Sequence, residues 1–175
     1  MAVPERFRIG SFAHADAQDH LSRSAVTHME SAPLIIRELT TTEPAFRAMV
    51  TALADAGLHT TDLHEGPVRY FMLGDGAAFG GISIFGTTAY LRSIVVTGPR
   101  RNGTGSALLQ HLLATARAGA AKEVWLFTLS AAEFFAKHGF VPQPRTNAPD
   151  AIAATRQFTE LCPESAVLMR CSLAP

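Results

Sequence analysis

The sequence predicts an α/β (α+β) domain in which helices flank a mixed, mostly antiparallel central sheet. Two observations carry this prediction. Three β-rich runs follow one another over residues 68–96 with only turn residues between them, which favours an antiparallel meander. A glycine-containing turn, an amphipathic helix over 106–118 and the apolar run 123–129 come next. This strand–helix–strand order makes two strands parallel through a right-handed crossover.

The other elements follow from period and from turn residues. Apolar residues recur at helical spacing after Pro44, and a threonine just before this proline is expected to cap the helix, which Gly57 ends. The motif Gly-Asp-Gly at 74–76 predicts the turn of the first hairpin. Further strands are expected over 34–39 and 165–173, and further helices over 130–140 and 149–162.

Composition bounds the function. The chain has 175 residues, 47% of them hydrophobic, and a formal net charge of zero without a dense basic block, which argues against a nucleic-acid partner. No apolar run reaches the roughly 20 residues of a membrane span, and the N-terminus lacks the pattern of a signal peptide. Cys162 and Cys171 do not form a disulfide framework, so we expect reduced thiols and a cytoplasmic protein.

The chain divides into two parts by pattern. Residues 1–30 show no steady period and are interpreted as a flexible extension, whereas residues 31–175 form the predicted domain. The extension carries His14, His20 and His28, but their irregular spacing lacks the clustering of a metal site, and no metal is expected.

One segment combines three structural features that favour the binding of an anion. Where the strand ending near Thr97 passes into a helix, the sequence reads Arg-Arg-Asn-Gly-Thr-Gly over 100–105. Free N–H groups and the helix dipole favour negative charge at such a helix start, and glycines let a ligand approach the backbone. The segment has neither a Walker lysine nor a third glycine at Leu108, so it predicts either a phosphate site or only a tight turn.

The wider context resembles a known family. A strand, Arg-x-x-Gly-x-Gly, an amphipathic helix, an apolar strand and then AAEFFAKHGF are similar to the GNAT superfamily of acyl-CoA-dependent N-acetyltransferases, over roughly Leu34–Leu173. The resemblance implies parallel strands that splay at the cofactor site, with acetyl-CoA as a substrate. It implies that coenzyme A binds the backbone and charges of the following residues: Ile94, Val95, Val96, Arg100, Arg101, Asn102, Gly103, Thr104, Gly105 and Ser106.

Finer motifs resemble two subgroups. GLHTTDL, LRSIVV and FTELCPESAVLMR are similar to small N-acetyltransferases of bacterial arsenic-resistance operons, and LFTLSAAEFFAKHGF is similar to the domain of bacterial glutamate N-acetyltransferases. Both imply a small-molecule amine or an amino-acid-like molecule as acceptor, without fixing which one. Two departures stand out. Phe135 occupies the position of the family's acidic tyrosine, and Ser83 stands where the arsenic-operon group often has a carboxylate.

The family's chemistry suggests roles for particular residues. A backbone N–H near Val95 would stabilise the thioester oxygen. His64 and Glu65 are candidate bases, and Cys162 is a candidate proton donor to the leaving thiolate. Each has an alternative, since the first two fit an exposed loop and the cysteine fits a buried structural position. The cations that could bind a substrate carboxylate are Arg92, Arg145 and Arg156.

Three functions stay open on the sequence. The leading prediction is a cytoplasmic N-acetyltransferase for a small amine. The alternatives are a protein N-acetyltransferase and a non-catalytic coenzyme-A-binding module, the second suggested by Phe135 and Ser83. The resemblance also implies a homodimer through the last strand.

Overall fold

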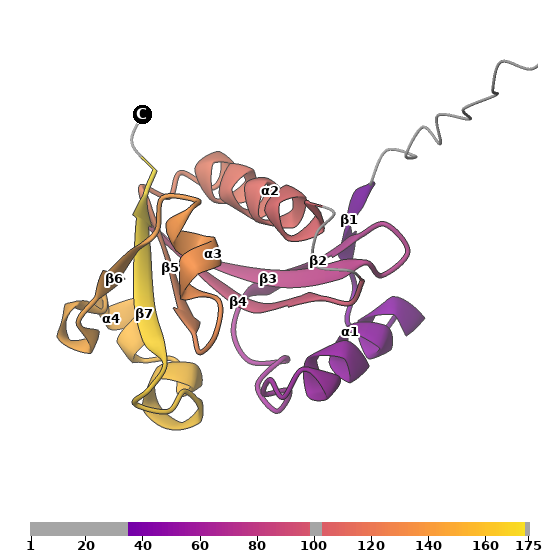
Figure 1. Cartoon of the computed structure of the whole chain (residues 1–175), viewed down its shortest axis with the longest axis horizontal. Coiled ribbons are helices and arrows are strands. Elements are labelled where there is room, and N and C mark those ends of the chain that lie inside the picture. The colour runs from indigo at the N-terminus through magenta and orange to yellow at the C-terminus, as the bar shows by residue number, and fades with distance from the viewer. Residues whose placement is uncertain (1–34, 99–102, 174–175) are drawn as a thin grey trace, which may run out of the picture. The chain divides into compact units, whose positions relative to one another are not determined.

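Seven strands form one sheet in the computed structural model, which describes residues 35–98 and 103–173 (Figure 1). Their order across the sheet is β1-β2-β3-β4-β5-β7-β6. The strands are β1 (Ile36–Leu39), β2 (Val68–Leu73), β3 (Ala78–Phe85), β4 (Thr88–Val96), β5 (Glu123–Thr128), β6 (Val141–Gln143) and β7 (Val167–Ser172). The helices are α1 (Pro44–Asp55), α2 (Thr104–Ala118), α3 (Ala132–Ala136) and α4 (Asp150–Ala153), with a 3₁₀ turn η1 (Arg145–Asn147) and a π turn η2 (Gln157–Leu161).

The pairing confirms the predicted mixed sheet. All neighbouring strands run antiparallel except β4 and β5, which are parallel and joined through α2. The predicted extension, residues 1–30, lies outside the described residues. No helix among those that the structure describes is long and apolar enough to cross a membrane.

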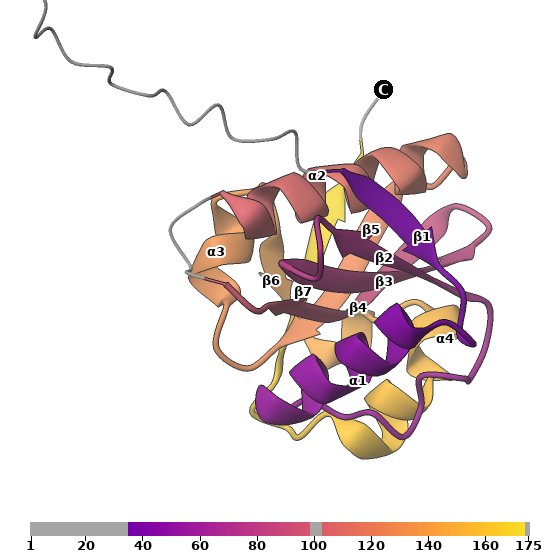
Figure 2. The same cartoon turned by 90° about the vertical axis from the view of Figure 1, so that its right-hand side faces the viewer.

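Helices cover both faces of the sheet (Figures 1 and 2). The helix α2 packs its predicted apolar stripe, which includes Leu108 and Leu112, against one face, and α3 joins it there with Phe135. The opposite face carries two clusters. One packs α1 through Met49 and Leu53, and the other packs α4 through Ile152. Because successive side chains of a strand alternate, β4 contributes to both faces.

A β-bulge interrupts β4 where it leaves β5. Phe79 pairs with Val95 and Gly81 pairs with Arg92, so Gly80 alone opposes the two residues Ser93 and Ile94. Ser93 has a φ of 54°, in the left-handed region that non-glycine residues rarely adopt. The β4–β5 pairing covers only 88–91 and 123–126, although both strands continue beyond it. The parallel strands therefore separate at the bulge, as the splayed geometry requires.

Three local predictions need correction. The expected helix over 149–162 is divided into α4 and η2, because the Thr155 hydroxyl donates to Ile152 O and accepts from Phe158 N–H, in competition with the helical ladder. The N-cap of α1 is Glu43, whose carboxylate accepts Thr40 N–H at 2.6 Å, and not a threonine. The short edge strand β6 was not predicted, since it has three residues with Pro142 at its centre.

Replacing Ser93 tests the bulge. Valine would place a β-branched side chain in the left-handed region, so we expect Ser93→Val to lower the free energy of unfolding by about 1–3 kcal/mol. Glycine adopts this φ freely, so Ser93→Gly is expected to stay within about 1 kcal/mol of wild type. Urea denaturation measures both variants, and equal stability of the two would contradict the strained backbone.

Candidate functional site

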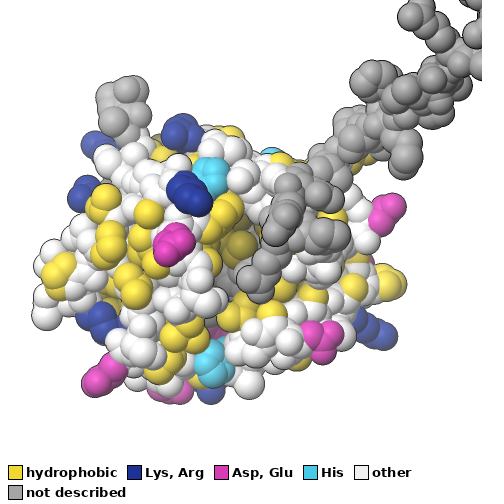
Figure 3. Space-filling view, viewed as in Figure 1, with side chains coloured by type: hydrophobic (Ala, Val, Ile, Leu, Met, Phe, Trp, Pro, Cys, Tyr) yellow, Lys and Arg dark blue, Asp and Glu magenta, His cyan; other side chains and the backbone are white. Residues whose placement is uncertain are grey.

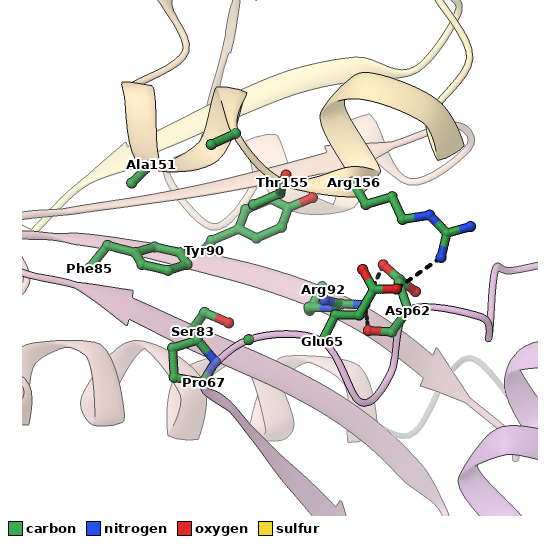
Figure 4. Close-up of a pocket in the computed structure, with 12 residues that line it drawn as sticks. Asp62, Glu65, Pro67, Ser83, Phe85, Tyr90, Arg92, Ala151, Thr155 and Arg156 are labelled. Carbon is green, nitrogen blue, oxygen red and sulfur yellow. Dashed lines mark hydrogen bonds and ion pairs between the residues drawn. The ribbon is translucent and has the colours of Figure 1, made fainter.

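A cavity of about 290 Å³ opens on the face of the sheet that carries α4 (Figure 4). The loop 59–67 forms one side, the strands β3 and β4 form the floor, and residues 151–156 form the other side. The lining residues are Asp62, Glu65, Gly66, Pro67, Ser83, Phe85, Tyr90, Arg92, Ala151, Ala154, Thr155 and Arg156. Segments far apart in sequence therefore converge on one small volume, close to the lower limit of typical ligand sites.

A buried ion pair lies at one end of this cavity. Arg92 is 8% exposed and Asp62 is 1% exposed. Arg92 Nη2 lies 2.5 Å from Asp62 Oδ2, a charge contact not aligned as a hydrogen bond, and it donates to Asp62 O at 3.1 Å. Among the described residues, Arg92 Nε and both carboxylate oxygens of Asp62 have no hydrogen-bond partner. Unmatched buried polar atoms are rare in native proteins, and here one donor and two acceptors lie together.

A second ion pair lies at the mouth of the cavity. Arg156 Nη1 donates to Glu65 Oε1 at 2.9 Å, and Arg156 Nε donates to Glu160 Oε2 at 2.8 Å. Contact with both carboxylates raises the pKa of Arg156. These side chains are largely exposed, so the pairs contribute little to stability. A ligand at the mouth could therefore separate these ion pairs with little loss of free energy.

Two buried tyrosines fix the walls. Tyr90 donates its hydroxyl proton to Gln157 Oε1 at 2.6 Å, which ties the π turn η2 to β4. Tyr70 donates to Leu63 O at 2.9 Å, which ties the loop 59–67 to β2. Burial raises the pKa of both phenols, that of Tyr70 to about 12, so both stay protonated at neutral pH and keep these bonds.

Two predicted site residues lie away from the cavity. Arg145 donates to the carbonyls of Cys162 and Pro163 at 3.1 and 3.3 Å, and its guanidinium stacks on Phe127 and Phe158. It therefore braces the segment after η2 and does not line the site, which corrects its prediction as a substrate ligand. His64 is exposed and packs beside Phe46, with ring centroids 5.4 Å apart, outside the cavity lining.

Cys162 follows η2 and is half-buried. Burial raises the pKa of its thiol, and the charges of Arg145, Asp62 and Arg92 act on it to a smaller degree. The thiol thus stays protonated at neutral pH and lies within electrostatic range of the buried ion pair. Its position does not decide between a proton donor and a structural role.

The start of α2 borders the gap where β4 and β5 separate. Its N-cap is Gly103, with a φ of 68°, and no side chain caps the first N–H groups. Gly105 faces β4 and α3, since a Cβ there would lie 3.4 Å from Val96 Cγ2 and 3.5 Å from Phe134 Cζ. Ser106 Oγ lies 3.0 Å from His138 Nε2. Arg100, Arg101 and Asn102 lie outside the described residues.

The register of β4 shifts the expected thioester donor. Thr97 N–H donates to Ala77 O, and hydrogen-bonded pairs alternate along an antiparallel ladder, so the pair Val95–Phe79 is also of the hydrogen-bonded kind. The Val95 amide therefore points to β3 and not to the gap, so the expected donor near Val95 belongs to a neighbouring residue. The amides of Ile94 and Val96 point the opposite way, toward the side that β5 leaves unpaired.

Phe135, which has no proton to donate, has a packing role. It is 5% exposed and meets Phe134 and Phe140 edge-to-face, with centroids 5.1 and 5.6 Å away. The side chains that approach the start of α2 are instead Phe134 of α3 and His138, which follows this helix. Within the described ranges, no group of three or more His, Cys, Asp or Glu side chains could hold a metal ion.

A second hollow, of about 510 Å³, lies between α1 and the end of β4. Its lining from α1 consists of alanines and Thr51, and Asp55 is its one charged side chain among the described residues. On the face in Figure 3, Lys and Arg side chains are scattered singly and do not form a basic patch.

Comparison with known proteins agrees with this geometry. Residues 67–142, from β2 through the start of β6, match the family model described as acetyltransferase (GNAT) domain. A search of curated proteins finds no match.

Solved structures share the fold. A putative acyl-CoA N-acyltransferase from Klebsiella pneumoniae is 20% identical with a TM-score of 0.64, over 81% of this chain and 99% of that one. A GNAT acetyltransferase from Elizabethkingia anophelis with acetyl-CoA bound is 13% identical with a TM-score of 0.57, over 80% and 98%. N-acetylglutamate synthase from Neisseria gonorrhoeae, complexed with coenzyme A and N-acetyl-glutamate, is 14% identical with a TM-score of 0.63. That alignment covers 81% of this chain and 36% of the synthase, so the chain spans about a third of its length.

The sheet order, the single parallel pair and its early separation are thus those of the GNAT fold. Residues 67–142 match the model of a GNAT acetyltransferase domain, and the chain has the fold of structures described as N-acetyltransferases.

Breaking the buried ion pair tests its energetics. We expect Arg92→Met to lower the free energy of unfolding by about 3–5 kcal/mol, because the Asp62 carboxylate would stay buried without its partner. The double variant Arg92→Met/Asp62→Leu removes both charges and is expected to recover most of that loss. Chemical denaturation of these variants measures the coupling free energy between Arg92 and Asp62. The half-exposed Arg170, paired with Glu123, is the control, and Arg170→Met should cost about 1 kcal/mol or less. Equal losses at both arginines would contradict the assignment.

Proposed function

We propose that the protein is an acetyl-CoA-dependent N-acetyltransferase that acetylates the amine of a small molecule. The observation that carries this proposal is the separation of β4 from β5 beside the uncapped start of α2. A thioester arm fits that gap, and the cavity at Arg92 lies on the same strand two residues from Ile94. Coenzyme A or acetyl-CoA in the neighbouring structures supports this choice of cosubstrate.

The cofactor is proposed to lie along β4. Amides of Ile94 and Val96 would pair with the pantetheine arm as an added strand does, with Val95 shaping the same edge. The N–H groups from Gly103 to Ser106 would hold the diphosphate with the positive end of the α2 dipole. Arg100, Arg101 and Asn102 are proposed to add charge and polar contacts, on the grounds of the sequence motif alone.

The reaction is a direct transfer. The acceptor arrives as an ammonium, loses one proton to a base, and its nitrogen attacks the thioester carbonyl carbon. A C–N bond forms and the C–S bond breaks, so the thiolate leaves with the electron pair and takes up a proton. The nitrogen loses its second proton to give the amide. Orientation of the two reactants supplies much of the rate, and the Ile94 amide is the proposed donor to the developing oxyanion.

The acid and base are assigned from the cavity lining and the thiol. Glu65 lines the cavity and is the proposed base, acting once the acceptor displaces it from Arg156. Cys162 is the proposed proton donor to the thiolate, because its raised pKa keeps the proton available at neutral pH. His64 faces away and is the weaker choice of base.

Finer features of the proposal rest on resemblance. An amino-acid-like acceptor fits the arginines Arg92 and Arg156 in the cavity lining. A link to arsenic resistance, a cytoplasmic location and a homodimer stay predictions from the sequence. A protein acceptor would need an open acidic groove, and the hollow beside α1 offers Asp55 alone. A non-catalytic coenzyme-A-binding module is the alternative, and a turnover assay distinguishes it from an enzyme.

Coenzyme A binding is tested at Gly105. The contacts that a Cβ would make are ordinary van der Waals distances, so Gly105→Ala should leave the melting temperature unchanged or raised. The added methyl lies between β4 and α3, where the pantetheine arm is proposed, so we expect the Kd for coenzyme A to rise about tenfold or more. Isothermal titration calorimetry measures it, with Ala114→Ser on the exposed side of α2 as control. Unchanged affinity in Gly105→Ala would place the cofactor elsewhere.

Turnover is tested by thiol release from acetyl-CoA with a panel of primary amines. We expect Cys162→Ala to lower kcat about 10- to 100-fold, with the Kd for coenzyme A unchanged. The wild-type kcat should fall as pH rises through the raised pKa of this thiol, and the variant should lose that limb. Cys171→Ala, in the core beneath α2, is the matched control. Tight coenzyme A binding with no turnover on any amine would favour the non-catalytic module.

A further inference from the structure

The two ends of the 290 Å³ cavity differ in chemistry (Figure 4). Asp62, Glu65, Arg92 and Arg156 gather at one end. Phe85, Pro67 and Ser83 lie toward the other, with Tyr90 and Thr155 between the two. An acceptor that fills this volume therefore meets charges with one end and apolar or hydroxyl groups with the other.

The charged end is complementary to a ligand that carries both a positive and a negative charge. The four ionisable side chains there are two anions and two cations, so their formal charges cancel. Arg92 Nε is a donor without an acceptor, and Asp62 Oδ1 is an acceptor without a donor, among the residues that the structure describes. A carboxylate satisfies the first atom and an ammonium satisfies the second. A simple amine would leave the arginine donor unmatched, which costs binding energy in a buried site.

The charged end is also the end nearest the transfer point. Arg92 directly precedes the bulge residues Ser93 and Ile94, and Ile94 carries the amide proposed to face the thioester oxygen. Ser83 pairs with Tyr90 farther from the bulge, so the uncharged end lies away from the acyl group. The nitrogen that is acetylated must therefore belong to the charged head of the acceptor and not to its tail.

We propose that the acceptor is an α-amino acid with an uncharged side chain, and that Asp62 binds its nitrogen while Arg92 binds its carboxylate. This inference rests on the proposed acetyltransferase function and deepens it. Only an ammonium and a carboxylate on one carbon bring both groups to a single ion pair. No sequence pattern singles out Asp62. Ser83 stands where the arsenic-operon group often has a carboxylate, and Asp62 supplies a carboxylate to the same cavity.

The far end sets the side-chain specificity. Pro67, Ser83, Phe85 and Ala151 lie there, with Tyr90 and Thr155 between the two ends, and none of these six carries a charge at neutral pH. Burying a side-chain carboxylate or ammonium there without a partner is costly. The site therefore selects an apolar or amide side chain and rejects glutamate, although a neighbour of the same fold is complexed with N-acetyl-glutamate.

The test is calorimetric titration of five probes into the protein saturated with coenzyme A. L-Methionine and L-glutamine carry the full head with an uncharged side chain, and L-glutamate adds a charge to the tail. The other two probes are 3-(methylthio)propylamine, which is methionine without its carboxylate, and 4-(methylthio)butanoate, which lacks the amine. We expect methionine and glutamine to bind about tenfold tighter or more than each of the other three.

Each other result overturns the inference. Equal affinity for 3-(methylthio)propylamine and methionine would remove the carboxylate from the site, and tighter binding of glutamate would place a cation at the far end. Binding of none of the five would also overturn it. Failure of the proposed function looks different, because then either coenzyme A itself would not bind, or methionine and glutamine would bind beside coenzyme A but would not be acetylated in the thiol-release assay.

Variants assign the two contacts without dependence on turnover. We expect Asp62→Asn to weaken methionine about tenfold or more while leaving the amine-free 4-(methylthio)butanoate and coenzyme A within about twofold. Glu160→Gln, on the exposed side of Arg156, is the matched control and should change none of the affinities. Equal weakening of all probes by Asp62→Asn would indicate a structural role instead, and the ligand series in the wild type then decides the substrate class.

Discussion

The bulge in β4 is the constraint on which both binding regions depend. It inserts Ser93 and Ile94 opposite Gly80, and beyond it β4 no longer pairs with β5. The amides of Ile94 and Val96 are therefore left facing a gap, beside an α2 start that has no side-chain cap. On the other face, the same bulge follows directly on Arg92, which turns into the cavity. One irregularity in one strand thus brings the proposed cofactor side and the proposed acceptor side within two residues of each other.

This arrangement carries energetic costs that the surroundings must offset. Ser93 occupies a left-handed conformation, and Arg92 and Asp62 are desolvated together. The supports are local and buried. Tyr70 packs tightly enough against Gly81 that a Cβ there would lie 2.8 Å from its ring, and its hydroxyl holds Leu63. Asp62 is the neighbour of Leu63, so the bond from Tyr70 fixes the loop that supplies the buried carboxylate. A buried pair of this kind is weak support for stability, and its retention in a cavity wall fits a binding role better.

Sequence reasoning recovers what depends on period and on local turn chemistry. The strand–helix–strand unit, the stripe of α2 and the end of α1 at Gly57 follow from residues within a turn or two of each other. It fails where a tertiary contact decides. Asp62 looks like any polar loop residue until Arg92, 30 positions away, meets it, and Arg145 looks like a ligand until Phe127 and Phe158 enclose it. The sequence places the thioester donor only near Val95, because the amides of neighbouring residues in a strand point in opposite directions and the register depends on the pairing with β3.

The acceptor side is assembled from parts whose positions depend on one another. Gln157 in the π turn accepts from Tyr90, and Arg145 holds the carbonyls of Cys162 and Pro163 just after that turn. The segment that follows Thr155 and Arg156 is therefore held to β4 at Gln157 and to η1 at Cys162 and Pro163. The loop with Glu65 is held through Tyr70 and Arg92. Between these two fixed segments, the exposed pair Glu65–Arg156 is the weakest connection. An acceptor that enters here, as proposed, would separate the exposed Glu65–Arg156 pair, which requires little free energy, and would then contact the rigid groups at the floor of the cavity. The groups that would orient the acceptor nitrogen in such a site are thus already fixed by folding, before the substrate binds. Under this condition, holding the two reactants close together accelerates acyl transfer.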